Sequence, residues 1–187
     1  ARLRQILILS TRVLAVLALI FAAARPLASG WMALGAGGKS DTVIILLDRS
    51  ASMEQQNLET GKSKRSTALE KIADLLEKTG RGSRIVLIDS ARLEKVELSG
   101  PKDLRDLPTT LPTDTMADIP ALLQAGLDHI SNDKSGRTDI WLASDLRVSD
   151  WQPGNGRWET LRASFSAVEG VNFFLLNYPD TGNENLA

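Results

Sequence analysis

One unbroken apolar run sets the strongest limit on the fold of this chain. Residues 43–47 read Val-Ile-Ile-Leu-Leu, with no polar side chain at any alternate position. A strand with one solvated face would alternate apolar and polar residues, so this run predicts a strand that is covered on both faces. Strands of that kind belong to parallel sheets with helices packed on either side. We therefore expect an α/β fold.

The following sequence repeats this pattern, with helical spacing between apolar runs. Residues 84–88, 139–143 and 171–176 read as further core strands, and residues 92–98 alternate like an edge strand. Three amphipathic segments are expected to be helices: residues 68–76, 119–130 and 158–168. The alternation of strands and helices predicts a doubly wound, mostly parallel sheet with flanking helices.

A longer apolar segment lies near the start of the sequence. Residues 6–24 are apolar except for Ser-Thr-Arg at residues 10–12. About 19 residues at 1.5 Å per residue span roughly 28 Å, close to the thickness of a bilayer's hydrocarbon core. We expect a transmembrane helix here. A cleaved signal peptide is disfavoured, because Pro26 follows closely on the small residues 22–24.

The charges that flank this segment predict its orientation. Arg2, Arg4 and Arg12 crowd one end, whereas Arg25 marks the other. Because cationic residues collect on the cytoplasmic side of a membrane, we expect the N-terminus inside and the soluble domain outside.

This division gives the expected domain organisation. Residues 1–27 form the transmembrane helix and its flanks, and residues 28–40 form a juxtamembrane linker rich in Gly and Ala. Residues 41–178 form the soluble domain. Residues 179–187 are a tail or the start of a further segment.

Composition excludes several classes of site. The net charge of −1 gives no reason to expect a nucleic acid as the main partner. The absence of cysteine excludes disulfides, thiolate catalysis and zinc-thiolate centres. His129 is the single imidazole, so centres that need two histidines are excluded as well. Its place late in an amphipathic helix predicts a partly exposed side chain without a catalytic role.

Oxygen-bearing residues follow two of the expected core strands. Asp48 comes directly after residues 43–47, and Asp145 comes two residues after the strand at 139–143. In open parallel sheets, ligands bind at the carboxyl ends of strands. Ser50 and Ser52 alternate with Asp48, so that three oxygen side chains can converge from one turn.

The loop before the helix at 119–130 offers further hydroxyls, from Thr113 and Thr115. Carboxylate and hydroxyl oxygens suit a hard ion such as Mg²⁺, with Mn²⁺ or Ca²⁺ as alternatives. If the hydroxyls bind directly and an aspartate acts through water, the ion stays electron-poor and favours an external carboxylate as its last ligand. Asp118 is expected to be a helix N-terminal acid rather than a ligand.

These residues resemble the metal-ion-dependent adhesion site of von Willebrand factor A (VWA) domains. The triplet Asp-x-Ser-x-Ser follows an apolar strand, and a later Thr and a strand-end Asp come in the expected order. The resemblance covers about residues 39–177. It implies a parallel sheet with one antiparallel edge strand and flanking helices. It also implies a Mg²⁺ ion held by side chains from three loops: Asp48, Ser50, Ser52, Thr115 and Asp145.

The chain departs from the family pattern in three places. Residues 111–115, Leu-Pro-Thr-Asp-Thr, stand where Gly-Gly-Thr is usual, so Thr113 remains the alternative to Thr115. Residues 144–146, Ser-Asp-Leu, stand where many relatives have Thr-Asp-Gly. No final helix or strand is expected after residue 179, so the last elements of the fold lie past residue 187 or are missing.

Residues 3–27 are similar to the membrane segment that precedes the A domain in bacterial aerotolerance proteins of the BatA type. This likeness implies a bacterial inner-membrane protein with its soluble domain on the periplasmic side. The metal site implies a protein partner that supplies an Asp or Glu ligand, and the BatA likeness implies a complex linked to an AAA-type ATPase system.

Two other functions are weighed against this interpretation. A degenerate VWA domain would serve as a structural spacer without metal. A Mg²⁺-dependent phosphotransferase would use Asp48 as its nucleophile and would need an acid/base aspartate two residues later. That position is Ser50, so we do not expect an enzyme.

Two clusters outside the motif are expected to be structural. Lys62, Lys64 and Arg65 read as a solvated loop, with a rim contact to an acidic partner as the alternative. Trp151 and Trp158 flank a Gly/Pro turn near Asp145 and are expected to cover the edge of the core.

Overall fold

A computed structural model of the chain describes residues 40–79, 82–105, 110–133, 136–151, 154 and 156–178. The predicted transmembrane helix at residues 6–24, most of the linker and the tail lie outside these described residues. Among the described residues, no helix is long and apolar enough to cross a membrane.

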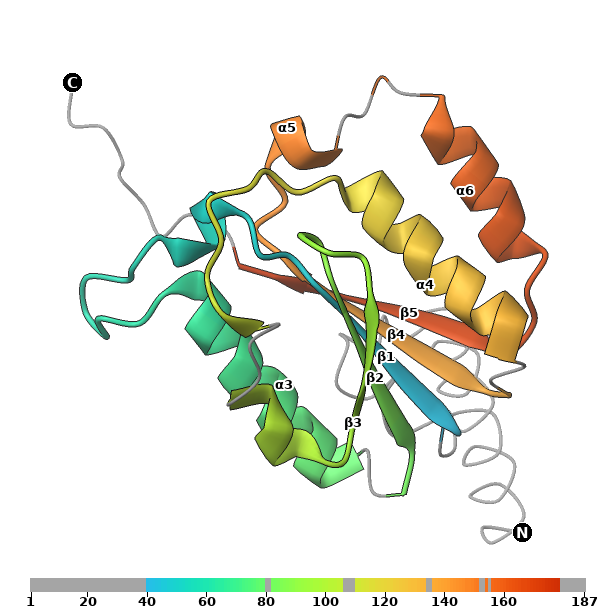
Figure 1. Cartoon of the computed structure of the whole chain (residues 1–187), viewed down its shortest axis with the longest axis horizontal. Helices are drawn as coiled ribbons and strands as arrows, with labels where there is room; N and C mark the ends of the chain where they lie inside the picture. Colours follow the sequence, from blue (N-terminus) through green and yellow to red (C-terminus); the bar gives the residue numbers. More distant parts are fainter. Residues whose placement is uncertain are drawn as a thin grey trace, which may run out of the picture. The chain divides into compact units, whose positions relative to one another are not determined.

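The described strands form one sheet in the order β3-β2-β1-β4-β5 (Figure 1). β3 runs antiparallel to β2, and the other neighbours are parallel. The predicted mostly parallel sheet with one antiparallel edge strand is therefore confirmed. The strand bounds are β1 (Thr42–Leu47), β2 (Arg84–Asp89), β3 (Lys95–Leu98), β4 (Thr138–Ser144) and β5 (Val171–Asn177).

Helices cover both faces of this sheet, as a doubly wound fold requires. In Figure 1, α3 (Lys64–Thr79) lies on one face, and α4 (Ile119–Asp133) and α6 (Arg157–Ser166) lie on the other. Three short elements were not predicted: η1 (Ala51–Glu54), η2 (Pro101–Arg105) and α5 (Val148–Trp151). Two of these, η1 and α5, come from the loops that follow β1 and β4.

β1 is the centre of the core. All six of its residues are buried, which confirms the two-sided strand expected from its apolar run. Ile44 and Leu46 pack in one cluster with residues of α4, and successive side chains of a strand point to opposite faces. Gly126 lets α4 come close to β1, because a Cβ there would lie 3.3 Å from Leu46 Cδ2.

Two elements begin three or more residues away from their expected starts. α3 begins at Lys64, four residues before the amphipathic pattern predicts. β3 begins at Lys95 rather than Arg92, because Leu93 adopts a positive φ of 59° and the chain turns there. Asp89 Oδ1 fixes this turn by accepting the backbone N–H of Ala91 and of Arg92.

The two tryptophans cover the edge of the core, as predicted. Trp151 and Trp158 stack with ring centroids 5.2 Å apart and planes within 5°. Both pack against the core cluster between the sheet and α4. The Trp158 indole N–H also donates to the Trp151 carbonyl over 2.7 Å. The pair therefore holds the end of α5 against the start of α6.

Candidate metal centre

The two predicted aspartates follow neighbouring strands at the same end of the sheet. β1 and β4 are paired so that Leu47 lies opposite Ala143, and the Asp48 N–H donates to the Ala143 carbonyl over 3.0 Å. Asp48 is fully buried and Asp145 is 8% exposed. The register of two parallel strands therefore brings together acids that are far apart in sequence.

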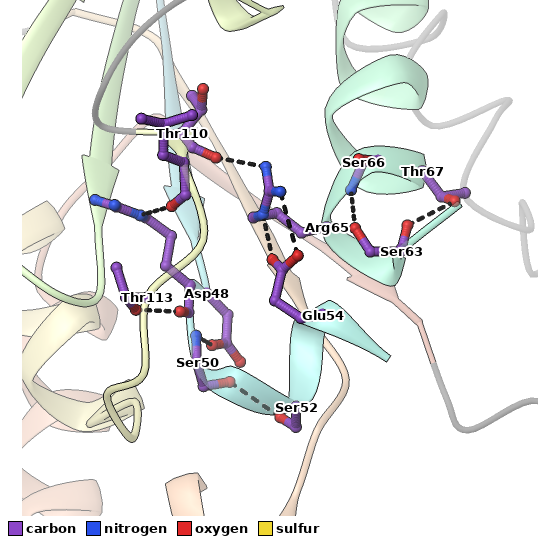
Figure 2. Close-up of polar contacts among 12 residues, drawn as sticks. Asp48, Ser50, Ser52, Glu54, Ser63, Arg65, Ser66, Thr67, Thr110 and Thr113 are labelled. Atoms are coloured by element: carbon purple, nitrogen blue, oxygen red, sulfur yellow. Dashed lines mark hydrogen bonds and ion pairs between the residues drawn. The ribbon is translucent and has the colours of Figure 1, made fainter. Parts of the chain in front are cut away.

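The Asp48 carboxylate is held by both of its oxygens. Its Oδ1 accepts the Ser50 N–H over 2.9 Å, and its Oδ2 accepts the Ser144 hydroxyl over 2.8 Å. Ser50 Oγ and Ser52 Oγ are 3.0 Å apart and hydrogen-bonded (Figure 2). The first predicted loop thus gathers its three oxygen side chains in one turn.

The second loop places both candidate threonines against the first. The Thr113 hydroxyl donates to the Arg49 carbonyl (Figure 2). It is also 2.9 Å from Thr115 Oγ1. The Thr115 carbonyl accepts the Ala51 N–H over 3.2 Å. Thr115 is exposed and Thr113 half-buried. Thr115 as the ligand stays a prediction, with Thr113 beside it.

Arg49 joins these loops, a role that no local sequence pattern signals. Its Nη1 lies 2.9 Å from Asp89 Oδ1 at the end of β2, and its Nε donates to the Leu111 carbonyl over 2.8 Å. Its backbone N–H donates to Ser90 Oγ. The residue is 4% exposed. The position between the metal-motif residues Asp48 and Ser50 therefore serves to anchor the second loop.

The third loop turns sharply directly after Asp145. Leu146 has a positive φ of 60°, in the region that favours glycine. Its N–H donates to Ser144 Oγ over 3.1 Å. The chain therefore keeps a Gly-like turn after Asp145 although the residue is leucine.

A third carboxylate, which the sequence reasoning missed, completes the centre. Asp150 in α5 is 2% exposed. One carboxylate oxygen from each of Asp48, Asp145 and Asp150 lies within 4.8 Å of the others. Opposite ligands lie roughly 4.6–5.2 Å apart around Ca²⁺ and about 4.2 Å apart around Mg²⁺. One ion can therefore reach all three oxygens, and Mg²⁺ requires them to lie no more than about 4.2 Å apart.

The predicted solvated basic loop is wrong for two of its three members. Lys64 is 9% exposed and its Nζ lies 3.2 Å from Asp145 Oδ2. Arg65 is half-buried, where it pairs with Glu54 and donates to the Thr110 carbonyl over 2.6 Å (Figure 2). Lys62 is exposed, as expected, and pairs with Glu70.

Mutual repulsion and burial act together on the acids of this centre. Burial is the main cause that raises the pKa of the Asp150 carboxyl, and the Ser149 hydroxyl opposes it. The charges of Asp48 and Asp145 raise the same pKa further, and the Arg147 charge opposes them. A buried carboxylate beside two others is therefore destabilised unless a cation balances it.

The donor set fits a hard divalent cation. Asp145 Oδ1 and Asp150 Oδ2 are buried and have no hydrogen-bond partner among the described residues. Buried carboxylate oxygens without a partner are uncommon, because they lose their hydration without compensation. A cation coordinated by carboxylates and hydroxyls would satisfy them. The expected site residues Asp48 and Asp145 would hold it, and Asp150 lies beside them.

His129 lies apart from this centre and is more buried than expected. It is 5% exposed, so the predicted partly exposed imidazole is wrong. Its Nδ1 lies 3.1 Å from Asp133 Oδ2, one helical turn later. Burial lowers the His129 pKa, and the Asp133 charge opposes that shift.

Asp118 is the helix N-terminal acid that the sequence predicts. Its Oδ1 accepts the Ala121 N–H over 2.9 Å at the start of α4. Its carboxylate also pairs with Arg157 of α6.

Comparison with known proteins gives a likeness in structure only. No family model and no curated protein matches the chain. Among solved structures, the chain is similar to the VWA domain of SpRpn10, with 11% sequence identity and a TM-score of 0.41. That match covers 75% of this chain and 88% of the other.

Proposed function

We propose that residues 41–178 form a VWA-type interaction domain that binds Mg²⁺ and, through the ion, a carboxylate of a partner protein. The observation that carries this proposal is the pair of buried, unpartnered oxygens on Asp145 and Asp150, beside the fully buried Asp48. The proposed ligands include the family set: Asp48, Ser50, Ser52, Thr115 and Asp145.

The exposure of the loops supports an external ligand on one side of the ion. The acids are buried, whereas Ser52 is half-exposed and Thr115 is exposed. A partner can therefore approach from the hydroxyl side. When bound, the ion supplies a coordination position that an Asp or Glu of the partner fills.

We propose a binding role rather than an enzyme. The hydroxyl of Ser50 stands where a phosphotransferase of this type needs a carboxylate, and it bonds to Ser52 Oγ instead. A serine hydroxyl there cannot act as the general acid or base. The geometry of the first loop thus favours coordination over proton transfer.

A structural spacer is the second candidate, and one contact favours it. The buried Lys64 ammonium already lies 3.2 Å from Asp145 Oδ2. In a spacer, this internal cation would take over part of the role of a metal. Heat on titration with Mg²⁺ or Mn²⁺ separates the two candidates, because a spacer would give none with either ion.

We also propose that residues 6–24 anchor the domain in the bacterial inner membrane, with the domain on the periplasmic side. The apolar length of this segment and the arginines at its start support the proposal. A protease added outside the inner membrane should then digest the domain. Complete protection, with digestion after lysis, would reverse the orientation. A BatA-like complex linked to an AAA-type ATPase is part of the same proposal.

The test of the proposed function is a capture experiment in Mg²⁺ and in EDTA. Tagged full-length chain should retain a partner in Mg²⁺ and lose it in EDTA, and Ser50→Ala should lose it in both. Ser99→Ala, which changes an exposed serine outside the metal loops, should behave like the wild type. A partner retained equally by Ser50→Ala and in EDTA would contradict the ion-mediated contact.

A further inference from the structure

The buried charges at the metal centre do not cancel, because acidic groups outnumber basic ones. Asp48, Asp145 and Asp150 are each at least nine-tenths buried, and Lys64 contacts them through Asp145. The exposed Arg147 also acts on Asp150 through its charge, which solvent screens. Among the buried groups, with all carboxyls ionised, three negative charges meet one positive charge. The excess is two negative charges, which is the charge that one divalent ion neutralises.

Asp145 and Asp150 each have one carboxylate oxygen with a partner and one without a partner among the described residues. Asp145 Oδ2 faces Lys64, while its Oδ1 has no partner among the described residues. Asp150 Oδ1 accepts the Ser149 hydroxyl, while its Oδ2 has no partner there either. Each acid is therefore anchored by one oxygen and keeps the other for a ligand.

From this geometry we propose that Asp150 is a third carboxylate ligand of the ion and that Lys64 stays on Asp145 as its compensating charge. This inference rests on the proposed metal site and names a ligand and a positioning residue that the family motif does not contain. Asp150 comes from α5, and Lys64 is the first residue of α3. Two elements outside the motif thus complete the centre.

The Lys64–Asp145 ion pair lets the loaded site accept a partner's carboxylate. Three carboxylates alone would give the loaded site a net negative charge and repel a partner's carboxylate. With Lys64 in place, the protein contributes the same net charge as a site with two aspartates. The ion can then be held by three acids and still accept an external carboxylate.

The test is a calorimetric titration of the EDTA-stripped, full-length chain with Mg²⁺ and with Mn²⁺ at fixed pH. Asp150→Asn should weaken ion binding by about tenfold or more, because a charged ligand is lost. Lys64→Met should strengthen it by about tenfold, because the competing positive charge is lost. The double variant should return close to the wild type.

Matched controls separate these effects from general charge effects. Asp114→Asn removes an exposed carboxylate from the second loop, and Lys62→Met removes an exposed lysine near Lys64 in sequence. Both should bind the ion like the wild type. Mn²⁺ electron paramagnetic resonance gives a second readout, because loss of the Asp150 ligand changes the spectrum of the bound ion.

The outcomes distinguish this inference from the proposed function. If Asp48→Asn abolishes binding while Asp150→Asn and Lys64→Met both bind like the wild type, the inference is overturned and the metal site stands. If the wild type binds neither ion, both are overturned. If Asp150→Asn fails to fold, the Lys64→Met titration decides, and unchanged affinity would overturn the inference.

Discussion

Two buried ion pairs lie at the carboxyl end of the sheet, and they differ in what surrounds them. Arg49 and Asp89 are 4% and 1% exposed, and Lys64 and Asp145 are 9% and 8% exposed. Asp89 Oδ1 also accepts backbone N–H groups of its own turn. Asp145 instead lies beside two further carboxylates.

An unpartnered oxygen alone does not separate the two pairs. Asp89 Oδ2 also has no hydrogen-bond partner among the described residues. The difference is buried charge: one buried cation faces one buried acid at Arg49, whereas one buried cation faces three buried acids at Lys64. A balanced pair holds loops in place, and an unbalanced one is suited to a further cation.

The largest effect is expected from breaking the balanced pair. Arg49→Met leaves Asp89 charged and buried and frees the Leu111 carbonyl, so the free energy of unfolding should fall by about 3–5 kcal/mol. Urea denaturation measures this. Lys62→Met, which breaks an exposed pair, should change it by less than about 1 kcal/mol. Equal effects of the two variants would contradict a larger contribution to stability from the buried Arg49 pair than from the exposed Lys62 pair.

The unbalanced pair predicts that a divalent ion stabilises the fold. At a Mg²⁺ concentration about 100 times the dissociation constant, the free energy of unfolding should rise by about 2.7 kcal/mol. The gain should vanish in Asp48→Asn and persist in Asp114→Asn. Thermal unfolding with Mg²⁺ and with EDTA measures the difference, and a gain retained by Asp48→Asn would place the ion elsewhere.

In EDTA, neutralising an acid should change the free energy of unfolding in opposite directions at the two ion pairs. Asp150→Asn removes a buried charge and its repulsion with Asp48 and Asp145, so the metal-free protein should gain about 1 kcal/mol in stability. Asp89→Asn should lose stability, because Arg49 then remains buried without its partner. Urea denaturation compares them. Destabilisation by Asp150→Asn in EDTA would mean that its charge is already balanced.

The smallest expected effect comes from His129, a buried base apart from both pairs. Burial lowers its pKa from the usual 6.5, so the unfolded chain takes up the proton first. Its contribution is therefore complete above about pH 6.5 and is lost as pH falls through the lower, folded pKa. The loss is at most about 1.4 kcal/mol per pH unit.

In EDTA, the free energy of unfolding of His129→Gln should depend less on pH than that of the wild type between about pH 7.5 and 5.5. The charges that act on His129 are those of Asp133, Lys95, Arg84 and Glu97. These remain in the variant, so any slope that they cause remains too. An identical slope in wild type and His129→Gln would contradict the assignment.

The strands and the first loop could be predicted because their signals are local. The apolar run at β1 encodes its two-sided burial, and Asp48 follows it directly. Parallel pairing then makes the meeting of Asp48 and Asp145 a matter of topology. The start of β3 was misjudged because alternation continues through Leu93, whose positive φ leaves no trace in the pattern.

The rest of the site depends on contacts between segments far apart in sequence. Lys64 lies 81 residues from Asp145, and in sequence it is one of three neighbouring basic residues. Arg49 occupies an unspecified position of the motif. Asp150 lies in a four-residue helix that has no sequence signature of its own. These roles depend on tertiary contacts, which a local sequence pattern does not encode.

The most direct test of the account is a calorimetric titration of the wild type and Asp48→Ala with Mg²⁺ and Mn²⁺. The account predicts one binding site in the wild type and none in Asp48→Ala, with both proteins folded by circular dichroism. Absence of heat with either ion in the folded wild type would contradict it and leave Lys64 as the cation that contacts Asp145.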